Sequence, residues 1–309
     1  MKYLVILFCL LGVSCTASEE QINRKADRMH DSFISIDTHS DTPMRFFRRG
    51  GFDPGVRSET GCVDFPRMKE GRLDAEFFAI FLGQGPRTPD AYEKVHNQTL
   101  ATFDSIYATL ARNASMAAIA LTPDDALRNK AEGKVSVFIG IENGYPVGKD
   151  LSRIKQYYDL GSRYITLCHS SNNDICDSST DKTGPEHNGL SAFGEEVVRE
   201  MNRVGMLVDV SHMSDESFYD VLAVSKVPVI ASHSSCRALC ESPRNLDDEM
   251  LQALKKNGGV IQICILSDYL RQPEPNPAYD EKVKELREKW VAMGELTDEQ
   301  QEQRWAEFS

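Results

Sequence analysis

The sequence contains no C-x-x-C pair, no internal repeat, no low-complexity tract and no linker rich in Pro, Gly or Ser. Without C-x-x-C pairs, a zinc site built from thiolates is not expected, and without linkers a single large domain is favoured. Positive charge is also scarce, since 35 Lys and Arg stand against 47 Asp and Glu for a formal net charge of −12. This balance argues against nucleic acid and anionic membrane surfaces as partners.

Long apolar runs are missing as well, and the single candidate lies at the N-terminus. Lys2 precedes the apolar run Tyr3–Gly12, which is too short to span a bilayer, and small residues then lead to Cys15. This pattern resembles a bacterial lipoprotein signal, with an ordinary secretory signal as the alternative. We expect residues 1–15 to be a signal peptide and the mature chain to be exported. A lipid on Cys15 would then be its only membrane contact, anchoring it to face the periplasm or the cell exterior.

What the chain does contain is an alternation of short apolar runs and amphipathic segments. The runs predict strands at Phe33–Asp37, Ala75–Phe81, Val135–Ile141, Arg163–Cys168, Met206–Val210, Pro228–Ser232 and Gly259–Ile265. Helical patterns lie between them, so we expect an α/β fold with a parallel sheet covered on both faces. The length suits one barrel domain of the (β/α)8 TIM type over residues 16–309. Seven strands are one short of closure, so we expect the closing strand to be missing and the domain to be incomplete at its C-terminus. A complete open sheet is the alternative.

Two consecutive predicted strands end in the same dipeptide, Ser211-His212 and Ser232-His233. Parallel strands point the same way, so both imidazoles should emerge at the C-terminal edge of the sheet, where α/β folds place their chemistry. Two unrelated loop histidines are the alternative. Because imidazole is a common metal ligand, the matched positions favour a shared ion.

Other strand ends carry side chains of the same kind. The first run leads into His39-Ser40-Asp41, and an extended H-x-D backbone places both side chains on one side. The third predicted strand ends at Glu142, whose burial is costly unless the carboxylate meets a metal or a basic partner, and a salt bridge is the alternative. The fourth ends at His169. This donor set exceeds what one zinc needs and favours two ions with a bridging carboxylate. His30, His96 and His187 are expected to be surface residues.

Several stretches, in order, resemble the membrane dipeptidase (renal dipeptidase) family of zinc metallopeptidases, among the amidohydrolase-like barrels. The resemblance covers nearly all of residues 30–268. It is carried by Ile36–Pro43, Asp64–Phe81, Gly140–Gly144, Gly161–Asn173, Gly189–Ser214 and Val227–Leu251.

The resemblance implies roles for particular residues. His39 and Asp41 would hold one zinc, His212 and His233 the other, and Glu142 would bridge the two ions. His169 would bond the oxygen of the scissile carbonyl, and Arg244 would hold the terminal carboxylate of the substrate. The family also has a strand that ends in a G-x-D-F-D-G-like motif, whose first aspartate carries protons, and no such motif occurs in this sequence.

The implied function is zinc-dependent hydrolysis of dipeptides by a metal-bound hydroxide at a binuclear site. A homodimer is compatible with this interpretation. Two alternatives remain open at this point: another amidohydrolase-like activity, such as that of a deacetylase or lactonase, and a non-catalytic barrel lipoprotein that only binds.

Overall fold

The computed structural model describes residues 18–47, 51–272, 274–294, 296–297, 299–300, 303–304 and 307. The predicted signal peptide at residues 1–15, with Cys15, lies outside the described residues. Among the helices of the described part, none combines the length and the apolar character that crossing a bilayer would require.

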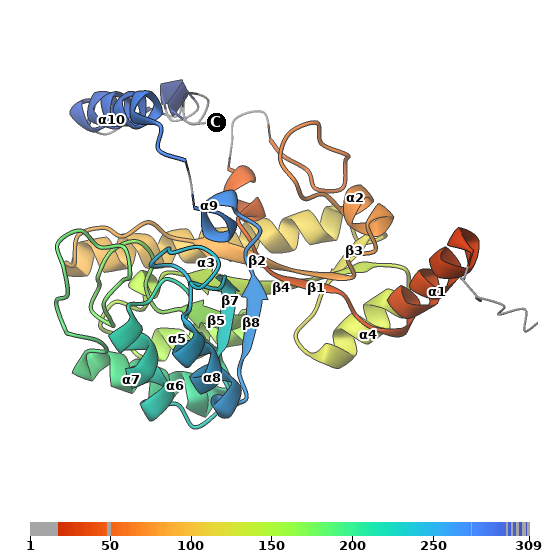
Figure 1. Cartoon of the computed structure of the whole chain (residues 1–309), viewed down its shortest axis with the longest axis horizontal. Helices are drawn as coiled ribbons and strands as arrows, with labels where there is room; N and C mark the ends of the chain where they lie inside the picture. The colour runs from red at the N-terminus through yellow and green to blue at the C-terminus, as the bar shows by residue number, and fades with distance from the viewer. Residues whose placement is uncertain are drawn as a thin grey trace, which may run out of the picture.

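A sheet of parallel strands forms the centre of the molecule (Figure 1). Its main path runs β1-β2-β4-β5-β6-β7-β8, and β3 pairs with β4 beside this path. Every strand pairing in the described part is parallel. The strands are β1 (Ile36–Ser40), β2 (Ala75–Phe81), β3 (Ala117–Ile119), β4 (Val135–Glu142), β5 (Ser162–Thr166), β6 (Leu207–Asp209), β7 (Ile230–Ser234) and β8 (Val260–Ile263).

The sheet curls until its first strand approaches its last ones, which makes it a TIM-type barrel that is nearly closed. The hydroxyl of Thr38 on β1 donates a hydrogen bond of 2.7 Å to the carbonyl oxygen of Ser232 on β7, although 194 residues separate them in the chain. In the described part, β8 pairs with β7 and has no second strand beside it. The predicted α/β barrel fold is therefore confirmed.

Two apolar clusters divide the core according to the alternation of side chains along each strand. Phe78 and Ile139 belong to the larger cluster, which includes residues of the surrounding helices such as Ile106. Phe77 and Phe138 face the other way and stack at 4.9 Å, and the Tyr164 ring stacks on Phe77 at 5.1 Å. The second cluster therefore lies on the concave face, below the C-terminal ends of the strands.

The helices begin and end where capping residues direct them. Ser214 accepts a hydrogen bond from the Ser217 N–H at the start of α7, while Gly205 and Gly258 end α6 and α8 with φ values of 86° and 82°. These left-handed positions favour glycine. The helices are α1 (Glu19–Ser32), α2 (Phe65–Glu70), α3 (Pro89–Arg112), α4 (Pro123–Ala131), α5 (Ser152–Asp159), α6 (Ala192–Val204), α7 (Asp215–Val224), α8 (Asp248–Asn257), α9 (Ser267–Leu270) and α10 (Pro277–Ala292), with the short 3-10 helices η1 (Thr42–Arg45) and η2 (Tyr145–Val147).

Two strand predictions need correction. The first strand was expected at Phe33–Asp37 but spans Ile36–Ser40. His39 is therefore the second-last residue of the strand and does not follow it. Strand β3, at Ala117–Ile119, was not predicted: it lies in the short apolar run Met116–Leu121, but half of that run is alanine, a residue that is depleted in strands. The other six predicted strands overlap observed ones.

The C-terminal elements pack loosely against the barrel. Helix α10 stands away from the sheet in Figure 1, and its one buried residue is Trp290, whose indole N–H donates to Glu307 at 3.0 Å. Strand β8 is exposed at both ends, since 53% of Val260 and 53% of Ile263 remain accessible, while the two residues between them are partly buried.

Candidate metal centre

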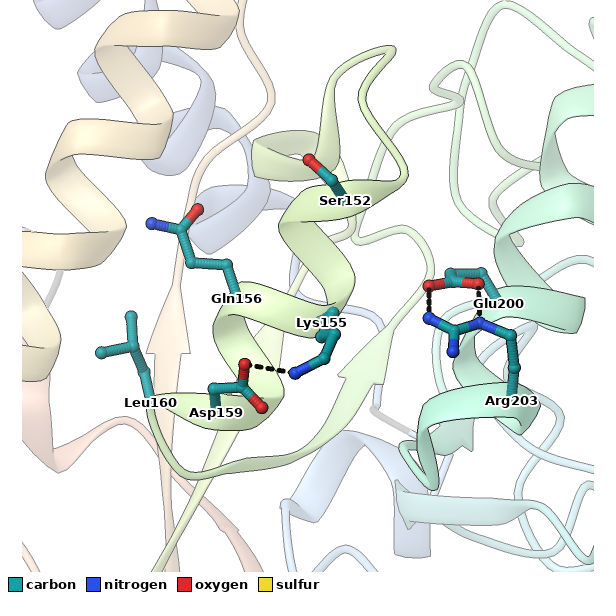
Figure 2. A pocket seen from close by; sticks show the side chains of 7 residues that line it. All are labelled: Ser152, Lys155, Gln156, Asp159, Leu160, Glu200 and Arg203. Carbon is teal, nitrogen blue, oxygen red and sulfur yellow. Dashed lines mark hydrogen bonds and ion pairs between the residues drawn. The ribbon is translucent and has the colours of Figure 1, made fainter.

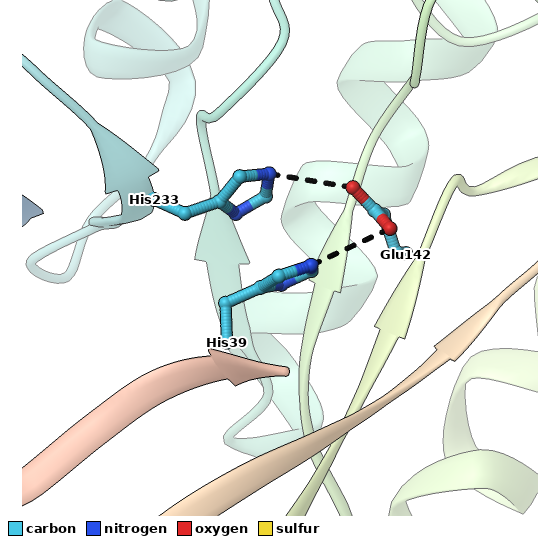
Figure 3. A group of neighbouring side chains, drawn as sticks. All are labelled: His39, Glu142 and His233. Carbon is cyan, nitrogen blue, oxygen red and sulfur yellow. Dashed lines mark ion pairs between the residues drawn. The ribbon is translucent and has the colours of Figure 1, made fainter. Parts of the chain in front are cut away.

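Side chains from four different strands converge on the carboxylate of Glu142, the last residue of β4 (Figure 3). His39 comes from β1 and His233 from β7, while His169 and His212 follow β5 and β6 directly. All of them sit at the C-terminal ends of parallel strands, so they lie together on one rim of the sheet. Glu142 itself is 3% exposed.

The two oxygens of Glu142 face different groups of imidazoles. Its Oε2 lies 3.5 Å from His39 Nε2, whereas its Oε1 lies 3.0 Å from His212 Nε2 and 3.3 Å from His233 Nε2. Figure 3 shows His39 and His233 on the same side of the carboxylate, each facing a different oxygen, and their rings stack with centroids 3.7 Å apart. In the described part, every ion pair of Glu142 is with a histidine, so the alternative of a salt bridge to lysine or arginine is not realised.

Asp41 and His169 occupy the outer part of the same cluster. Asp41 Oδ1 lies 3.8 Å from His39 Nε2, and 55% of its side chain remains exposed. His169 Nε2 lies 3.8 Å from Glu142 Oε1, and its ring centroid is 4.3 Å from that of His212. The rim thus brings together all six residues that sequence reasoning assigned to it.

The opposite ring nitrogens of the histidines are mostly held by hydroxyl groups. The Nδ1 atom lies 3.0 Å from the Tyr164 hydroxyl in His39, 2.7 Å from the Ser232 hydroxyl in His233 and 3.0 Å from the Ser170 hydroxyl in His169. In His212, which adopts φ = 73°, Nδ1 is buried without a hydrogen-bond partner in the described part of the chain. Hydrogen bonds on Nδ1 turn the Nε2 atoms toward the carboxylate.

Burial and charge divide the histidines into two kinds. Burial opposes a charge on His39, but the Glu142 carboxylate outweighs it and raises the pKa of His39 to about 9. Burial, reinforced by the charge of His39, lowers the pKa of His233 to about 4. Burial and the nearby Arg244 guanidinium also hold the pKa of His212 well below its usual range. His212 and His233 are therefore neutral at pH 7, the form in which imidazole binds metal.

The chemistry of these donors fits divalent cations. His39, Glu142 and His233 form one group of ligand atoms within 4.8 Å of one another, and Glu142, His169 and His212 form a second, with Glu142 common to both. Two neutral imidazoles approach to 2.9 Å between their Nε2 atoms, and both also approach a buried carboxylate oxygen. Imidazole nitrogen and carboxylate oxygen are the usual ligands of zinc.

Arg244 lies at the border of the cluster and not on the surface. It is 5% exposed, its Nη2 donates to the His233 carbonyl oxygen at 3.0 Å, and its guanidinium lies over the Tyr269 ring. Its Nε is buried without a partner in the described part of the chain. A buried donor left unpaired is costly unless a ligand satisfies it.

One prediction about histidines is wrong. His96 is not a surface residue: it is 8% exposed, and its Nδ1 lies 2.7 Å from the Tyr157 hydroxyl. It belongs to the face of α3 that also buries Tyr92, Val95 and Phe103, a spacing that sequence inspection could have recognised. His30 is exposed as expected, and His187 is half-buried with its Nε2 2.8 Å from the Asn173 carbonyl oxygen.

Sequence reasoning missed two buried carboxylates on the barrel strands, Asp209 on β6 and Glu76 on β2. Each is an acidic residue inside an otherwise apolar run, which was the available signal. All six cysteines of the described part are free thiols.

Two cavities adjoin the barrel. One of about 590 Å³ has walls that include Pro43, Phe81 and Gly83, and the Phe81 ring lies edge-on to His169 at 4.7 Å. The other, of about 600 Å³, lies between α5 and α6, where Lys155 pairs with Asp159 and Arg203 pairs with Glu200 (Figure 2). Because its charged groups pair with each other, the second cavity offers little for chemistry.

Comparison with known proteins agrees with this geometry. The chain is 36% identical over 255 residues to the uncharacterized dipeptidase C965.12 of Schizosaccharomyces pombe. The matched region covers 77% of this chain and 60% of the relative. The chain is also 36% identical over 250 residues to dipeptidase verJ of Clonostachys rogersoniana, covering 77% of this chain and 63% of the relative. The chain thus spans less than two thirds of either relative's length.

A solved structure and a family model agree as well. The crystal structure of the probable dipeptidase PvdM from Pseudomonas aeruginosa matches with a TM-score of 0.76 and 30% identity, covering 89% of this chain and 70% of that one. The model of the membrane dipeptidase family, peptidase family M19, matches residues 23–296. The chain belongs to the membrane dipeptidase family of metallopeptidases, peptidase family M19.

Proposed function

We propose that the whole protein is a metallodipeptidase with a binuclear zinc site on this rim. The observation that carries the proposal is the arrangement around Glu142, whose two oxygens face separate groups of imidazoles. His39 and Asp41 would hold one ion, His212 and His233 the other, and Glu142 would join them. When bound, such ions lower the pKa of a water molecule and polarise a carbonyl group.

The remaining residues would bind and orient the substrate. His169, whose Nε2 is 3.8 Å from Glu142, would donate a hydrogen bond to the scissile carbonyl oxygen. The unpartnered Nε of Arg244 and its charge support a role in holding the terminal carboxylate of a dipeptide. The apolar cavity beside Phe81 would receive an uncharged side chain. Because Arg244 would bind the terminal carboxylate at a fixed distance from the scissile bond, the site would favour dipeptides over longer peptides.

The place of the protein in the cell is also a proposal. The sequence at residues 1–15 supports export and a lipid on Cys15 as the anchor, and the acidic net charge of −12 is consistent with no nucleic-acid partner. Loss of membrane association in a Cys15→Ala variant would support the anchor, and unchanged membrane association would contradict it.

Glu142→Gln tests the function directly. The substitution keeps the volume but removes the charge that balances two dications, so we expect the loss of at least one zinc per chain and of nearly all dipeptide turnover. Zinc content by elemental analysis and hydrolysis of unblocked dipeptides are the measurements. Glu132→Gln, at an exposed glutamate, is the matched control and should change neither. A Glu142→Gln protein with full zinc content and normal turnover would remove Glu142 from the bridging role.

A further inference from the structure

Asp209, the last residue of β6, is a fully buried carboxylate just beneath the metal-binding rim. Its Oδ1 accepts the backbone N–H groups of Ser211 at 3.0 Å and Ser232 at 2.9 Å. Its Oδ2 accepts the hydroxyls of Thr166 at 2.5 Å and Ser232 at 2.7 Å. Four donors therefore point at one side chain that can only accept.

This arrangement decides the direction of the next hydrogen bond. The Ser232 hydroxyl has one hydrogen, and it is used toward Asp209, so its oxygen can only accept from its other neighbours. These are the Ser211 hydroxyl at 3.4 Å and His233 Nδ1 at 2.7 Å, and His233 Nδ1 must then carry the ring proton. A neutral imidazole has one N–H, so Nε2 of His233 keeps its lone pair. This atom lies 2.9 Å from His212 Nε2, from which it can accept a hydrogen bond, and 3.3 Å from Glu142 Oε1.

We propose that Asp209 and Ser232 are positioning residues that hold His233 in the tautomer whose Nε2 lone pair faces the metal site. The role in metal binding rests on the proposed function. The hydrogen-bond geometry rests only on the side chains of Asp209, Ser232 and His233.

The hydrogen bonds that link Asp209, Ser232 and His233 Nδ1 form a relay. Asp209→Asn should reverse the direction of these hydrogen bonds rather than merely weaken them. The backbone N–H groups of Ser211 and Ser232 cannot turn, so the amide oxygen must take their side and the amide NH2 must take the side of the hydroxyls. The Ser232 oxygen then accepts from the amide, and its hydrogen turns to His233 Nδ1. His233 is driven into the other tautomer, with a proton on Nε2 where the metal should bind.

Ser232→Ala has a milder effect, because it removes the relay without forcing either tautomer. Loss of such outer hydrogen bonds typically lowers metal affinity about 10- to 100-fold. We expect Asp209→Asn to lower zinc affinity about 100-fold and Ser232→Ala about 10-fold. In the double variant the inverted hydroxyl is gone, so its affinity should recover to that of Ser232→Ala alone.

Two measurements on the whole chain test the relay. Zinc affinity is measured by chelator competition, and the His233 tautomer is read from ¹⁵N NMR of the metal-free protein, which needs neither zinc nor turnover. Asp64→Asn is the matched control, since Asp64 is also fully buried and accepts from Ser58 and Arg67, neither of which is among the six rim residues. It should change neither quantity.

A purely structural role would make the double variant at least as weak as Asp209→Asn, and that result would overturn the proposal. A proton on Nε2 of His233 in the unmodified protein would overturn it as well. If the NMR result holds but the unmodified protein binds no divalent metal, the proposed metal function fails while the hydrogen-bond relay stands.

Discussion

Arg244 separates substrate binding from chemistry at the scale of a single residue. Arg244→Ala should raise KM for dipeptides about ten- to a hundred-fold with little change in kcat, because losing a hydrogen bond to a charged group costs on the order of 1.5–3 kcal/mol. Steady-state kinetics with a dipeptide and with its C-terminal amide is the measurement. The amide should already bind poorly to the unmodified enzyme. Equal kinetics for acid and amide would end the carboxylate assignment, and unchanged zinc content is the control for the Arg244 contact with His233.

Glu76 makes a prediction about stability and pH. Burial, with Asp37 adding to it, raises the pKa of Glu76 from its ordinary 4.5 to about 9. Neither carboxyl oxygen has a hydrogen-bond partner in the described part of the chain. The folded protein therefore keeps this group protonated, whereas the unfolded chain ionises it above about pH 4.5. The free energy of unfolding is not affected below pH 4.5 and is lowered increasingly as pH rises toward 9.

Glu76→Gln removes the titration while keeping the shape. The variant should be more stable than the unmodified protein by on the order of 1–3 kcal/mol at pH 8, with a smaller difference at pH 5.5. Denaturant unfolding of the metal-free protein at both pH values checks this. Glu281→Gln on the exposed face of α10 is the control and should show no pH-dependent gain. A variant less stable at pH 8 would show that Glu76 is ionised and held by a partner.

At the scale of elements, Asp177 organises the long loop between β5 and α6, which contains His169. It is 1% exposed, and its carboxylate accepts the backbone N–H groups of Glu186, His187 and Gly189 at 2.9–3.1 Å. Asp177→Ala leaves these donors without an acceptor, so the loop should open locally. The exposed Lys182 lies in this loop and provides a trypsin site.

We expect trypsin to cut after Lys182 at least tenfold faster in Asp177→Ala, since a loss of about 1.5 kcal/mol in local stability corresponds to about tenfold more open loop. Mass spectrometry of timed digests measures the rate. Trypsin should cut the control variant Asp104→Ala, changed at an exposed position on α3, after Lys182 at the same rate as the unmodified protein. Equal rates in both variants would mean that other contacts hold the loop.

The elements also show what sequence reasoning can reach. The rim residues were predictable because parallel strands align their C-terminal ends, so His169, His212 and His233 needed only the strand assignment. The relay was not predictable, because hydrogen-bond direction among Asp209, Ser232 and His233 depends on how the side chains of two neighbouring strands, β6 and β7, meet. Strand β3 was missed because its three residues gain their strand conformation from pairing with β4, and not from their own pattern.

At the scale of the whole molecule, the sheet has an open side. Strand β8 pairs with β7 alone in the described part, and beyond it 85% of Ile265 and 50% of Leu266 are exposed. An exposed apolar edge strand is a template for pairing with another chain. We propose that in the whole protein a further strand covers this edge and brings an acidic proton carrier to the rim, as the greater length of the relatives supports.

This proposal predicts how the 309-residue chain behaves by itself. It should self-associate through the edge of β8, and Ile263→Lys, which places a charge there, should shift the population toward monomer. Light scattering over a concentration series measures the state, and hydrogen exchange should show poorly protected amides on β8. A longer form of the protein that contains such a strand should be less associated, should protect β8, and should turn over dipeptides faster. A 309-residue chain that is monomeric, protects β8 and is as active as the longer form would show that the barrel needs no further strand.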